Sequence, residues 1–267
     1  MKKFVDLMSL TSSDKIKLIE DLEKTLPIVT TTDVRGQKLN FLTHTKRQLW
    51  QALGMEFIEP ELLNYLDALP AGSVYYDIGA SNGIFSLYAA ALGLQVCAFE
   101  PEAQNYALLE YNNFLNRSHE NWSLHTYNLA IGSQHSLGTM YIAKYEAAGH
   151  LKILNKAVKV QESESFLPEH TQTILTYDLD SLISKMGLVP PQHLKIDVDG
   201  SEFEVLKGAI QTLNSAQLKS VFIEIDDTSA GSKFIYTFLE DCSFILQKKF
   251  PVQHYENLSN CIFIKII

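Results

Sequence analysis

The sequence predicts an α/β fold with a mostly parallel sheet and helices on both of its faces. From Ser73 onward, short apolar runs alternate with segments of helical spacing, and a glycine-bearing loop follows the first run in "YYDIGASNGIFSLYAA". Strands separated by helices form βαβ units, whose strands run parallel. Near the C-terminus, "FILQKKF" and "NCIFIKII" have no helix between them. These two runs therefore predict an antiparallel pair at the sheet edge.

The first 58 residues precede this pattern, so we expect an N-terminal extension of helical and irregular structure over 1–58 and the main domain over 59–267. Residues 14–26 predict a short helix that ends before Pro27, because apolar residues recur there at helical spacing. These residues are Ile16, Ile19, Leu22 and Leu26. The rest of the extension is mixed in character, apart from a weak strand at "QKLNFL".

The main domain divides into alternating predicted strands and helices. Apolar runs bounded by turn residues predict strands at 74–78, 95–100, 123–128, 193–198 and 220–224. Helical spacing predicts helices at 84–92, 104–115 and 203–213, and a further helix that begins at Pro60.

The segment 138–172 does not follow this alternation. It is rich in Lys, Glu and Ser and irregular apart from a strand at "TMYIA". Because it is too long for an ordinary connection, it is either an insertion that covers the substrate or a mobile loop, and we favour the first.

Composition excludes several classes of function. The chain has 267 residues, of which 46% are hydrophobic, so it can bury one large core. A formal charge of −9 argues against a nucleic-acid partner held by phosphate contacts. The three cysteines are far apart, and no run approaches the roughly 18 apolar residues of a membrane helix. We therefore expect a cytoplasmic protein that binds neither nucleic acid nor membrane.

Two acids flank the glycine loop. Asp77 and Gly79 fall at the carboxyl end of the first strand, where ligands bind in open parallel sheets. Gly79 and Gly83 allow the backbone to turn tightly, and the helix that begins at Ile84 offers free N–H groups. Glu100 ends the second strand, where it can accept hydrogen bonds from the two hydroxyls of a ribose.

Two ligands suit such a loop. A dinucleotide uses G-x-G-x-x-G and places its pyrophosphate at the helix N-terminus, where an acid is unfavourable. Here the glycines are spaced G-x-x-x-G and Asp77 precedes them. S-adenosylmethionine carries an amine and a sulfonium but no phosphate, so it tolerates the acid. The glycine spacing also occurs where a helix and a strand merely pack closely, so the prediction depends on Asp77 and Glu100 together.

A second acidic cluster lies in "HLKIDVDGSEFEVLKGA". Asp197 should emerge at the same sheet edge as Asp77 and Glu100, where a carboxylate can orient a hydroxyl, take its proton or hold a divalent cation. The neighbouring "SVFIEIDD" adds Glu224 and Asp226. Such acids are more often solvated, so we assign no metal, and Asp197, Glu224 and Asp226 are the candidates should Mg²⁺ bind.

Several linked motifs resemble the FkbM-type methyltransferases, which use S-adenosylmethionine. They are "YYDIGASNGIFSLYAA", "VCAFEPEAQNYALLEYN", "NLAIGS", "LKIDVDGSEFEVLKGA" and "VFIEID", and the resemblance covers roughly residues 45–265. It implies a Rossmann-like, seven-stranded methyltransferase sheet that is parallel except for its last strand. It also implies cofactor contacts around the loop, at the ribose and at the adenine. The matching residues are Asp77, Gly79, Ala80, Ser81, Gly83, Glu100, Asn128, Leu129 and Ala130.

The family's loop usually reads D-I-G-A-N-x-G, whereas Ser81 and Asn82 follow Ala80 here. Since backbone groups make most of the contacts in such a loop, we expect cofactor binding to survive the change. The resemblance also implies that Asp197 faces the methyl group and the acceptor, as the catalytic base.

The function implied is O-methylation of a hydroxyl on a sugar, a glycan precursor or another small metabolite. Two alternatives stay open: an NAD(P)-dependent oxidoreductase, which shares the strand, the glycine loop and the second acid, and a non-catalytic binding protein that kept the fold. The partners expected are the acceptor molecule and, as an open option, a second copy of the chain.

Overall fold

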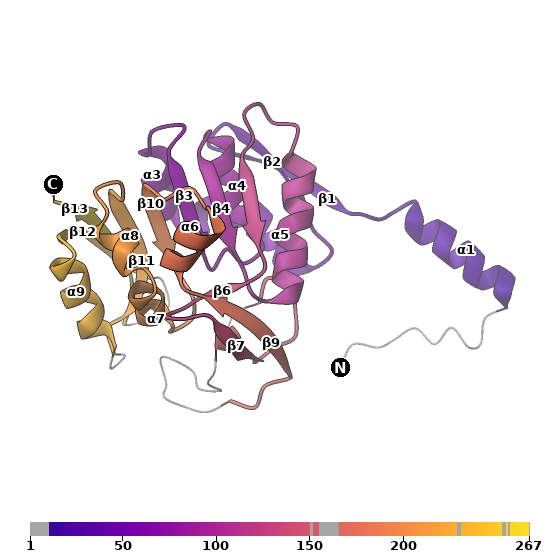
Figure 1. The fold of residues 1–267 in the computed structure, drawn as a ribbon. Helices are drawn as coiled ribbons and strands as arrows, with labels where there is room; N and C mark the ends of the chain where they lie inside the picture. Colours follow the sequence, from indigo (N-terminus) through magenta and orange to yellow (C-terminus); the bar gives the residue numbers. More distant parts are fainter. Residues whose placement is uncertain are drawn as a thin grey trace.

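The computed structural model describes most of the chain. The described residues are 11–149, 152–154, 166–228, 231–252, 255 and 257–266. Within them the strands form a seven-stranded sheet, a four-stranded sheet and a two-stranded hairpin (Figure 1). No helix in these residues is long and apolar enough to cross a membrane.

The seven-stranded sheet is the centre of the molecule, with strand order β12-β13-β11-β10-β3-β4-β5. Its strands are β3 (Val74–Ile78), β4 (Gln95–Phe99), β5 (Leu124–Tyr127), β10 (His193–Ile196), β11 (Ser220–Asp226), β12 (Phe244–Pro251) and β13 (Leu258–Lys265). All neighbouring pairs are parallel except those of β13, which runs antiparallel to both β11 and β12. The predicted parallel sheet with an antiparallel last strand is confirmed.

The order of the strands reverses beside β3. The chain runs outward from β3 to β4 and β5 and then returns to β10 on the other side of β3. Loops that leave β3 and β10 therefore turn to opposite faces of the sheet and leave a crevice at the carboxyl ends of the strands.

Helices cover the sheet on both faces. One core contains side chains of α2 (Lys46–Ile58), α3 (Pro60–Asp67), α4 (Ile84–Ala91) and α5 (Ala103–Asn116). The opposite core contains side chains of α6 (Leu179–Met186), α7 (Glu202–Lys207), α8 (Ile210–Asn214) and α9 (Ser232–Asp241). Successive strand residues alternate between the two, so Tyr75 packs in the first core and Tyr76 in the second.

The single helix predicted over 203–213 is instead the pair α7 and α8, a correction that the packing explains. Gly208 lies between them, and a Cβ there would stand 1.9 Å from the carbonyl oxygen of Gly132. The carbonyl of Gly208 accepts a hydrogen bond from the backbone N–H of Asp180, whose carboxylate accepts bonds from the backbone of Gln211 and Thr212 at the start of α8. These contacts with α6 interrupt the helix.

Residues 29–58 are more regular than the sequence pattern indicated. The predicted strand at 37–42 is β2 (Gln37–Leu42), and it pairs with β1 (Val29–Val34). The helix α2 was missed, although Thr45 and Gln48 form a capping box at its start. Side chains from all three elements reach the first core, while the domain boundary placed at residue 58 stays a prediction.

Before β1, α1 (Ser12–Glu23) projects from the body of the molecule (Figure 1). It is the helix that the sequence predicts over 14–26.

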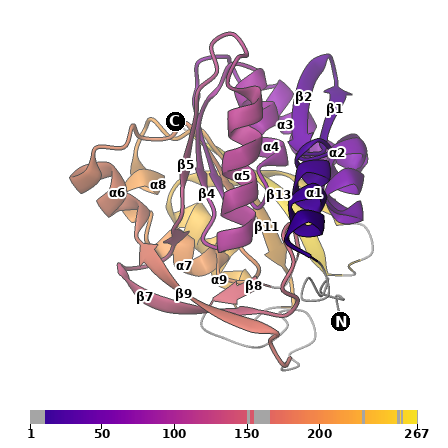
Figure 2. The same ribbon diagram turned by 90° about the vertical axis from the view of Figure 1, so that its right-hand side faces the viewer.

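The second sheet lies at the lower edge of the central sheet (Figures 1 and 2). It consists of β6 (Ala130–Ile131), β7 (Ser136–Ile142), β8 (Lys152–Leu154) and β9 (His170–Tyr177), in the order β6-β9-β7-β8. The segment 138–172 therefore contains more strand than "TMYIA" alone. In β9 the apolar Leu175 is exposed and the polar Thr176 is buried, so the strand lacks the regular alternation by which a half-buried strand is recognised in a sequence. Residues 150–151 and 155–165 of this segment lie outside the described residues.

Candidate functional site

A cleft of about 780 Å³ of empty volume opens at the carboxyl edge of the central sheet. The loops after β3, β4 and β10 form one side of it, and the second sheet forms the other. It therefore lies at the crevice that the strand order creates.

The loop after β3 approaches β10 so closely that only glycine fits at its first position. Gly79 has φ +86, and a Cβ on it would stand 1.7 Å from the backbone oxygen of Asp197. The backbone N–H groups of Gly79 and Ala80 both donate to the carbonyl of Phe99 at the end of β4, at 3.0 Å. The loop thus joins the ends of three strands at the floor of the cleft.

Glu100 places a buried carboxylate at the cleft. Its side chain is 5% exposed, and its two oxygens each accept a backbone hydrogen bond, from Ser81 and from Glu102, at 2.8 Å. Burial raises its pKa to about 7, although these bonds and the nearby Lys152 act in the opposite direction. Each carboxylate oxygen has a further lone pair with which it can accept a bond from a ligand hydroxyl.

Asp77 lies behind the loop rather than in the lining of the cleft. It is 1% exposed and accepts a hydrogen bond from Ser86 at 2.5 Å. Its second oxygen is 3.0 Å from Nζ of Lys195, which is itself 3.3 Å from a carboxylate oxygen of Asp197 and donates to the carbonyl of Gly79 at 3.2 Å. Burial alone would lower the pKa of Lys195, but the carboxylates of Asp77 and Asp197 raise it above its ordinary value. Lys195 is therefore a buried cation between two acids.

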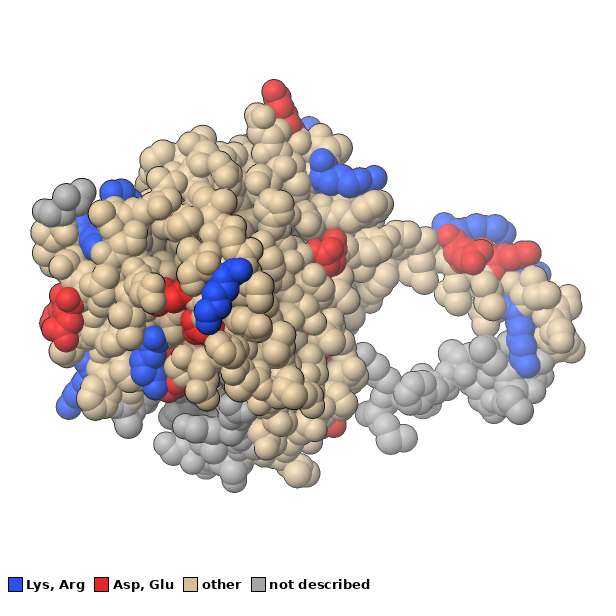
Figure 3. Space-filling view, in the orientation of Figure 1, with Lys and Arg blue, Asp and Glu red and all other residues tan. Residues whose placement is uncertain are grey.

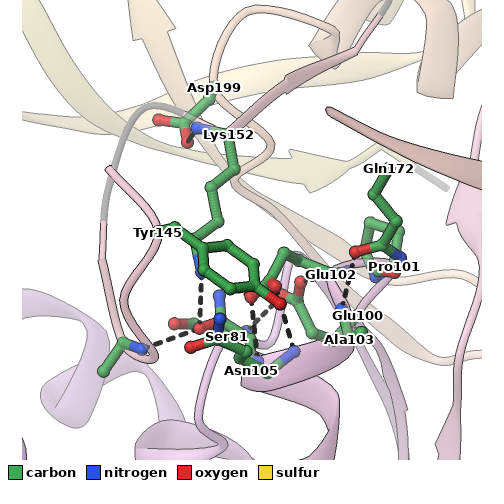
Figure 4. A network of polar contacts seen from close by, with 12 residues as sticks. Ser81, Glu100, Pro101, Glu102, Ala103, Asn105, Tyr145, Lys152, Gln172 and Asp199 are labelled. Carbon is green, nitrogen blue, oxygen red and sulfur yellow. Dashed lines mark hydrogen bonds and ion pairs between the residues drawn. The ribbon is translucent and has the colours of Figure 1, made fainter. Parts of the chain in front are cut away.

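A network of polar contacts closes the other side of the cleft (Figure 4). Nζ of Lys152 lies 2.5 Å from a carboxylate oxygen of Glu102 and 2.9 Å from the side-chain oxygen of Asn105. The backbone N–H of Lys152 donates to Asp199, and that of Ala148 donates to Asn105. The segment 138–172 is thus fastened to the start of α5 and to the loop after β10, and Met140, Lys152 and Leu154 line the cleft.

The sequence did not point to Lys152. It is one of several lysines in a polar segment, and its pairing with Glu102 is visible only when β8 is placed against α5.

The predicted cofactor residues divide into two groups, and their roles remain predictions. Those that line the cleft are Gly79, Ser81, Glu100, Leu129 and Ala130, together with Asp197. The others, Asp77, Ala80, Gly83 and Asn128, support these positions. Asn128, for example, donates from its side chain to the carbonyls of Glu100 and Pro101.

Two further carboxyl groups, those of Glu59 and Glu224, lie close enough to Asp197 for its charge to raise their pKa values. Burial, and then the charge of Asp197, raises the pKa of Glu59 to about 8 and the pKa of Glu224 well above its ordinary value. In the described part of the chain, neither side chain accepts a hydrogen bond. Glu59 was not among the predicted site residues, and the only signal for it is its place immediately before the helix that begins at Pro60.

The predicted metal candidates do not form a recognisable metal centre. Among the described residues, no group of three His, Cys, Asp or Glu side chains could hold a metal ion. One oxygen of Asp226 accepts hydrogen bonds from the backbone and hydroxyl of Thr228, while Glu224 and Asp197 are near each other.

Comparison with known proteins identifies the family. A family model described as the methyltransferase FkbM domain matches residues 77–246, which is more than half of the chain. The chain belongs to the FkbM methyltransferase family. The predicted resemblance is confirmed, and of the three classes that the sequence left open, an enzyme that transfers methyl groups is the correct one.

This FkbM methyltransferase matches two curated relatives, and it spans most of one and only a small part of the other. It is 22% identical over 196 residues to the hexuronic acid methyltransferase AglP of Haloferax volcanii, an alignment that covers 72% of each protein. It is 28% identical over 190 residues to the AMB antimetabolite synthetase AmbE of Pseudomonas aeruginosa, which covers 61% of this chain but only 9% of the synthetase.

A solved structure shows the same fold. The methyltransferase FkbM from Methylobacillus flagellatus KT matches with a TM-score of 0.51 at 14% identity, and the match covers 74% of this chain and 45% of that one.

Replacement of Gly79 by Ala is expected to lower the free energy of unfolding by about 3 kcal/mol or more, because the new Cβ meets backbone rather than a flexible side chain. Gly36 is the matched control, since its φ is +88 but nothing lies within 4 Å of its Cβ position. There, Ala should cost only about 1 kcal/mol of backbone strain. Urea unfolding of both variants measures the difference between their free energies of unfolding. Equal losses of stability would show that the contact between the new Cβ and Asp197 does not destabilise the protein.

Replacement of Glu59 by Gln is expected to stabilise the protein at alkaline pH. The pKa of Glu59 is about 8 in the folded protein against an ordinary 4.5, so the free energy of unfolding falls as the pH rises from 4.5 through about 8. Gln carries no such charge. The melting temperature of the variant should exceed that of the wild type at pH 9 and match it at pH 4.5, and parallel curves over this range would contradict the raised pKa.

Proposed function

We propose that this FkbM methyltransferase transfers a methyl group from S-adenosylmethionine to a hydroxyl of a sugar, a glycan precursor or another small metabolite. One observation carries the proposal: the buried carboxylate of Glu100 and the exposed edge of Asp197 line the same cleft, with the glycine loop between them. In this arrangement, Glu100 can accept hydrogen bonds from the hydroxyls of the cofactor's ribose, and Asp197 can accept the proton of the substrate hydroxyl.

The residues of the cleft suit the cofactor in its size, charge and polarity. Apolar side chains from Phe99, Leu129 and Ile131 line the part next to Glu100 and can pack against an adenine, while Glu100 accepts the ribose hydroxyls. Gly79 lines the cleft as well, and its carbonyl can accept a hydrogen bond from the amine. When bound, S-adenosylmethionine supplies an electrophilic methyl group that the acceptor oxygen attacks.

Asp197 is the residue that we assign to the acceptor hydroxyl. Its side chain is 31% exposed, and its ion pair with the buried Lys195 fixes its position. Methyl transfer is an in-line displacement, so most of the rate comes from alignment, and a base is needed only for the hydroxyl proton. Glu59, with a pKa of about 8, is mostly protonated at neutral pH and does not compete with Asp197 for this role.

The negative charge near Asp197 also influences which methyl acceptor can bind in the cleft. Lys195 is already paired with both Asp77 and Asp197, and two carboxylates around one ammonium group leave one net negative charge beside the cleft. A neutral hydroxyl compound is therefore favoured over an acidic one, because a carboxylate beside these groups would be repelled. The name of the relative AglP supports a saccharide acceptor, and the charge pattern here favours an uncharged sugar over a hexuronic acid.

Calorimetric titration with S-adenosylhomocysteine tests the cofactor. The wild type should bind in the micromolar range, and Glu100→Ala should raise the dissociation constant about 10- to 100-fold, since charge-assisted hydrogen bonds are worth about 1.5–3 kcal/mol. Wild-type affinity should also rise with pH through about 7, as Glu100 loses its proton. Binding of NAD in place of S-adenosylhomocysteine would overturn the proposal.

Replacement of Asp197 by Asn tests the role of the base. Transfer of labelled methyl groups to neutral glycosides should slow about 10²- to 10⁴-fold, the usual range for a lost general base. The affinity for S-adenosylhomocysteine should change little, because Asn keeps the shape of the side chain. Full turnover in the variant would remove Asp197 from the mechanism.

A further inference from the structure

The helix α1 has an apolar stripe that packs on nothing within the described chain. Ile16, Ile19 and Leu22 share one side of the helix and are 47–58% exposed, and none of its residues is buried. Figure 2, viewed along the direction in which the helix projects, shows it in front of the body, and Figure 3 shows it standing apart from the body like an arm.

A helix of 12 residues is marginally stable in water by itself. Its N-terminus has a capping box between Thr11 and Asp14, which contributes about 1 kcal/mol. Most of the stability of such a helix must come from packing of its apolar side. In its own chain the stripe faces Leu42, His44 and Tyr111 only across an open hollow of about 710 Å³. The stripe therefore requires a partner. That partner either fills the hollow or packs on α1 in place of the body of its own chain.

A second uncovered apolar face lies on α2. Its inner side contributes Ala52 and Met55 to the core, whereas Trp50, Leu53 and Phe57 point outward and are 58–80% exposed. These three residues are spaced at i, i+3 and i+7, so they share one side of the helix. Large aromatic side chains of this kind are typical of the central residues of protein interfaces.

Charge complementarity indicates that the two faces match each other. In α1 the first half carries Lys15 and Lys17 beside Asp14, and the second half carries only acids, Glu20, Asp21 and Glu23. In α2 the order is the same, with two basic residues at the start and Glu56 near the end. An antiparallel pairing of α1 with α2 brings opposite charges together at both ends.

We propose that α1 is an exchanged arm and that the partner is a second copy of this chain. The stripe of α1 in one copy packs antiparallel on Trp50, Leu53 and Phe57 of the other. A two-fold axis makes each copy both donor and receiver of an arm, so a closed dimer covers both faces of both chains.

Sedimentation velocity on the full chain tests the proposal. The wild type is expected to be a dimer, and Ile19→Asp in the arm or Leu53→Asp on α2 should each raise the dissociation constant at least tenfold. Met186→Asp is the matched control, because Met186 is as exposed as Leu53 but lies at the end of α6 on the opposite face of the sheet. Circular dichroism and melting temperature confirm that each variant is folded.

Disulfide trapping identifies which faces meet. The three native cysteines are buried, so a mixture of Ile19→Cys protein and Leu53→Cys protein should yield the mixed disulfide dimer under mild oxidation. A monomeric wild type would overturn the proposal, as would disulfides that form only between two Ile19→Cys chains, because the arms would then pair with each other. A dimer that neither Asp variant weakens would overturn it as well.

Discussion

The floor of the cleft depends on the contacts that the buried ammonium group of Lys195 makes. This group lies between Asp77 on β3 and Asp197 at the end of β10, and it also donates to the carbonyl of Gly79. A buried ion pair is costly to desolvate, but removal of one partner leaves a buried charge and typically costs about 3–5 kcal/mol. Through this one cation, the two central strands, the glycine loop and the proposed base take up fixed positions relative to one another.

The extent to which each acidic side chain is buried, rather than its residue type, decides its role at the site. Asp77, Glu100 and Asp197 all follow apolar strands, and on that pattern alone they are equivalent. In the structure Asp77 is enclosed and neutralises Lys195, Glu100 is buried but lines the cleft, and Asp197 is partly exposed. Both oxygens of Asp77 are occupied away from the cleft, by Ser86 and Lys195, whereas Glu100 and Asp197 reach the cleft and keep the capacity to bind a ligand there.

The central sheet could be predicted because its signals are local. Each parallel strand is a short apolar run bounded by turn residues, and β3 occupies the residues that the sequence indicated. The helix α2 could not, because its apolar residues are divided between Ala52 and Met55 inside and Trp50 and Phe57 outside, so no single stripe is visible. Lys152 and Glu59 reach the site through contacts between distant segments, which no short window of sequence contains.

The same division of α2 connects the arm to the cleft. On its inner side, Gln51 accepts a hydrogen bond from the side chain of Asn82 in the glycine loop, and Arg47 donates to the carbonyl of Ala148, next to the segment that carries Lys152. Its outer side is the apolar face proposed to receive the arm. A helix held from outside has less freedom to shift, and both the loop and the cover of the cleft are bonded to it. Arm exchange would therefore order the two walls between which the cofactor lies, without any residue of the second copy entering the site.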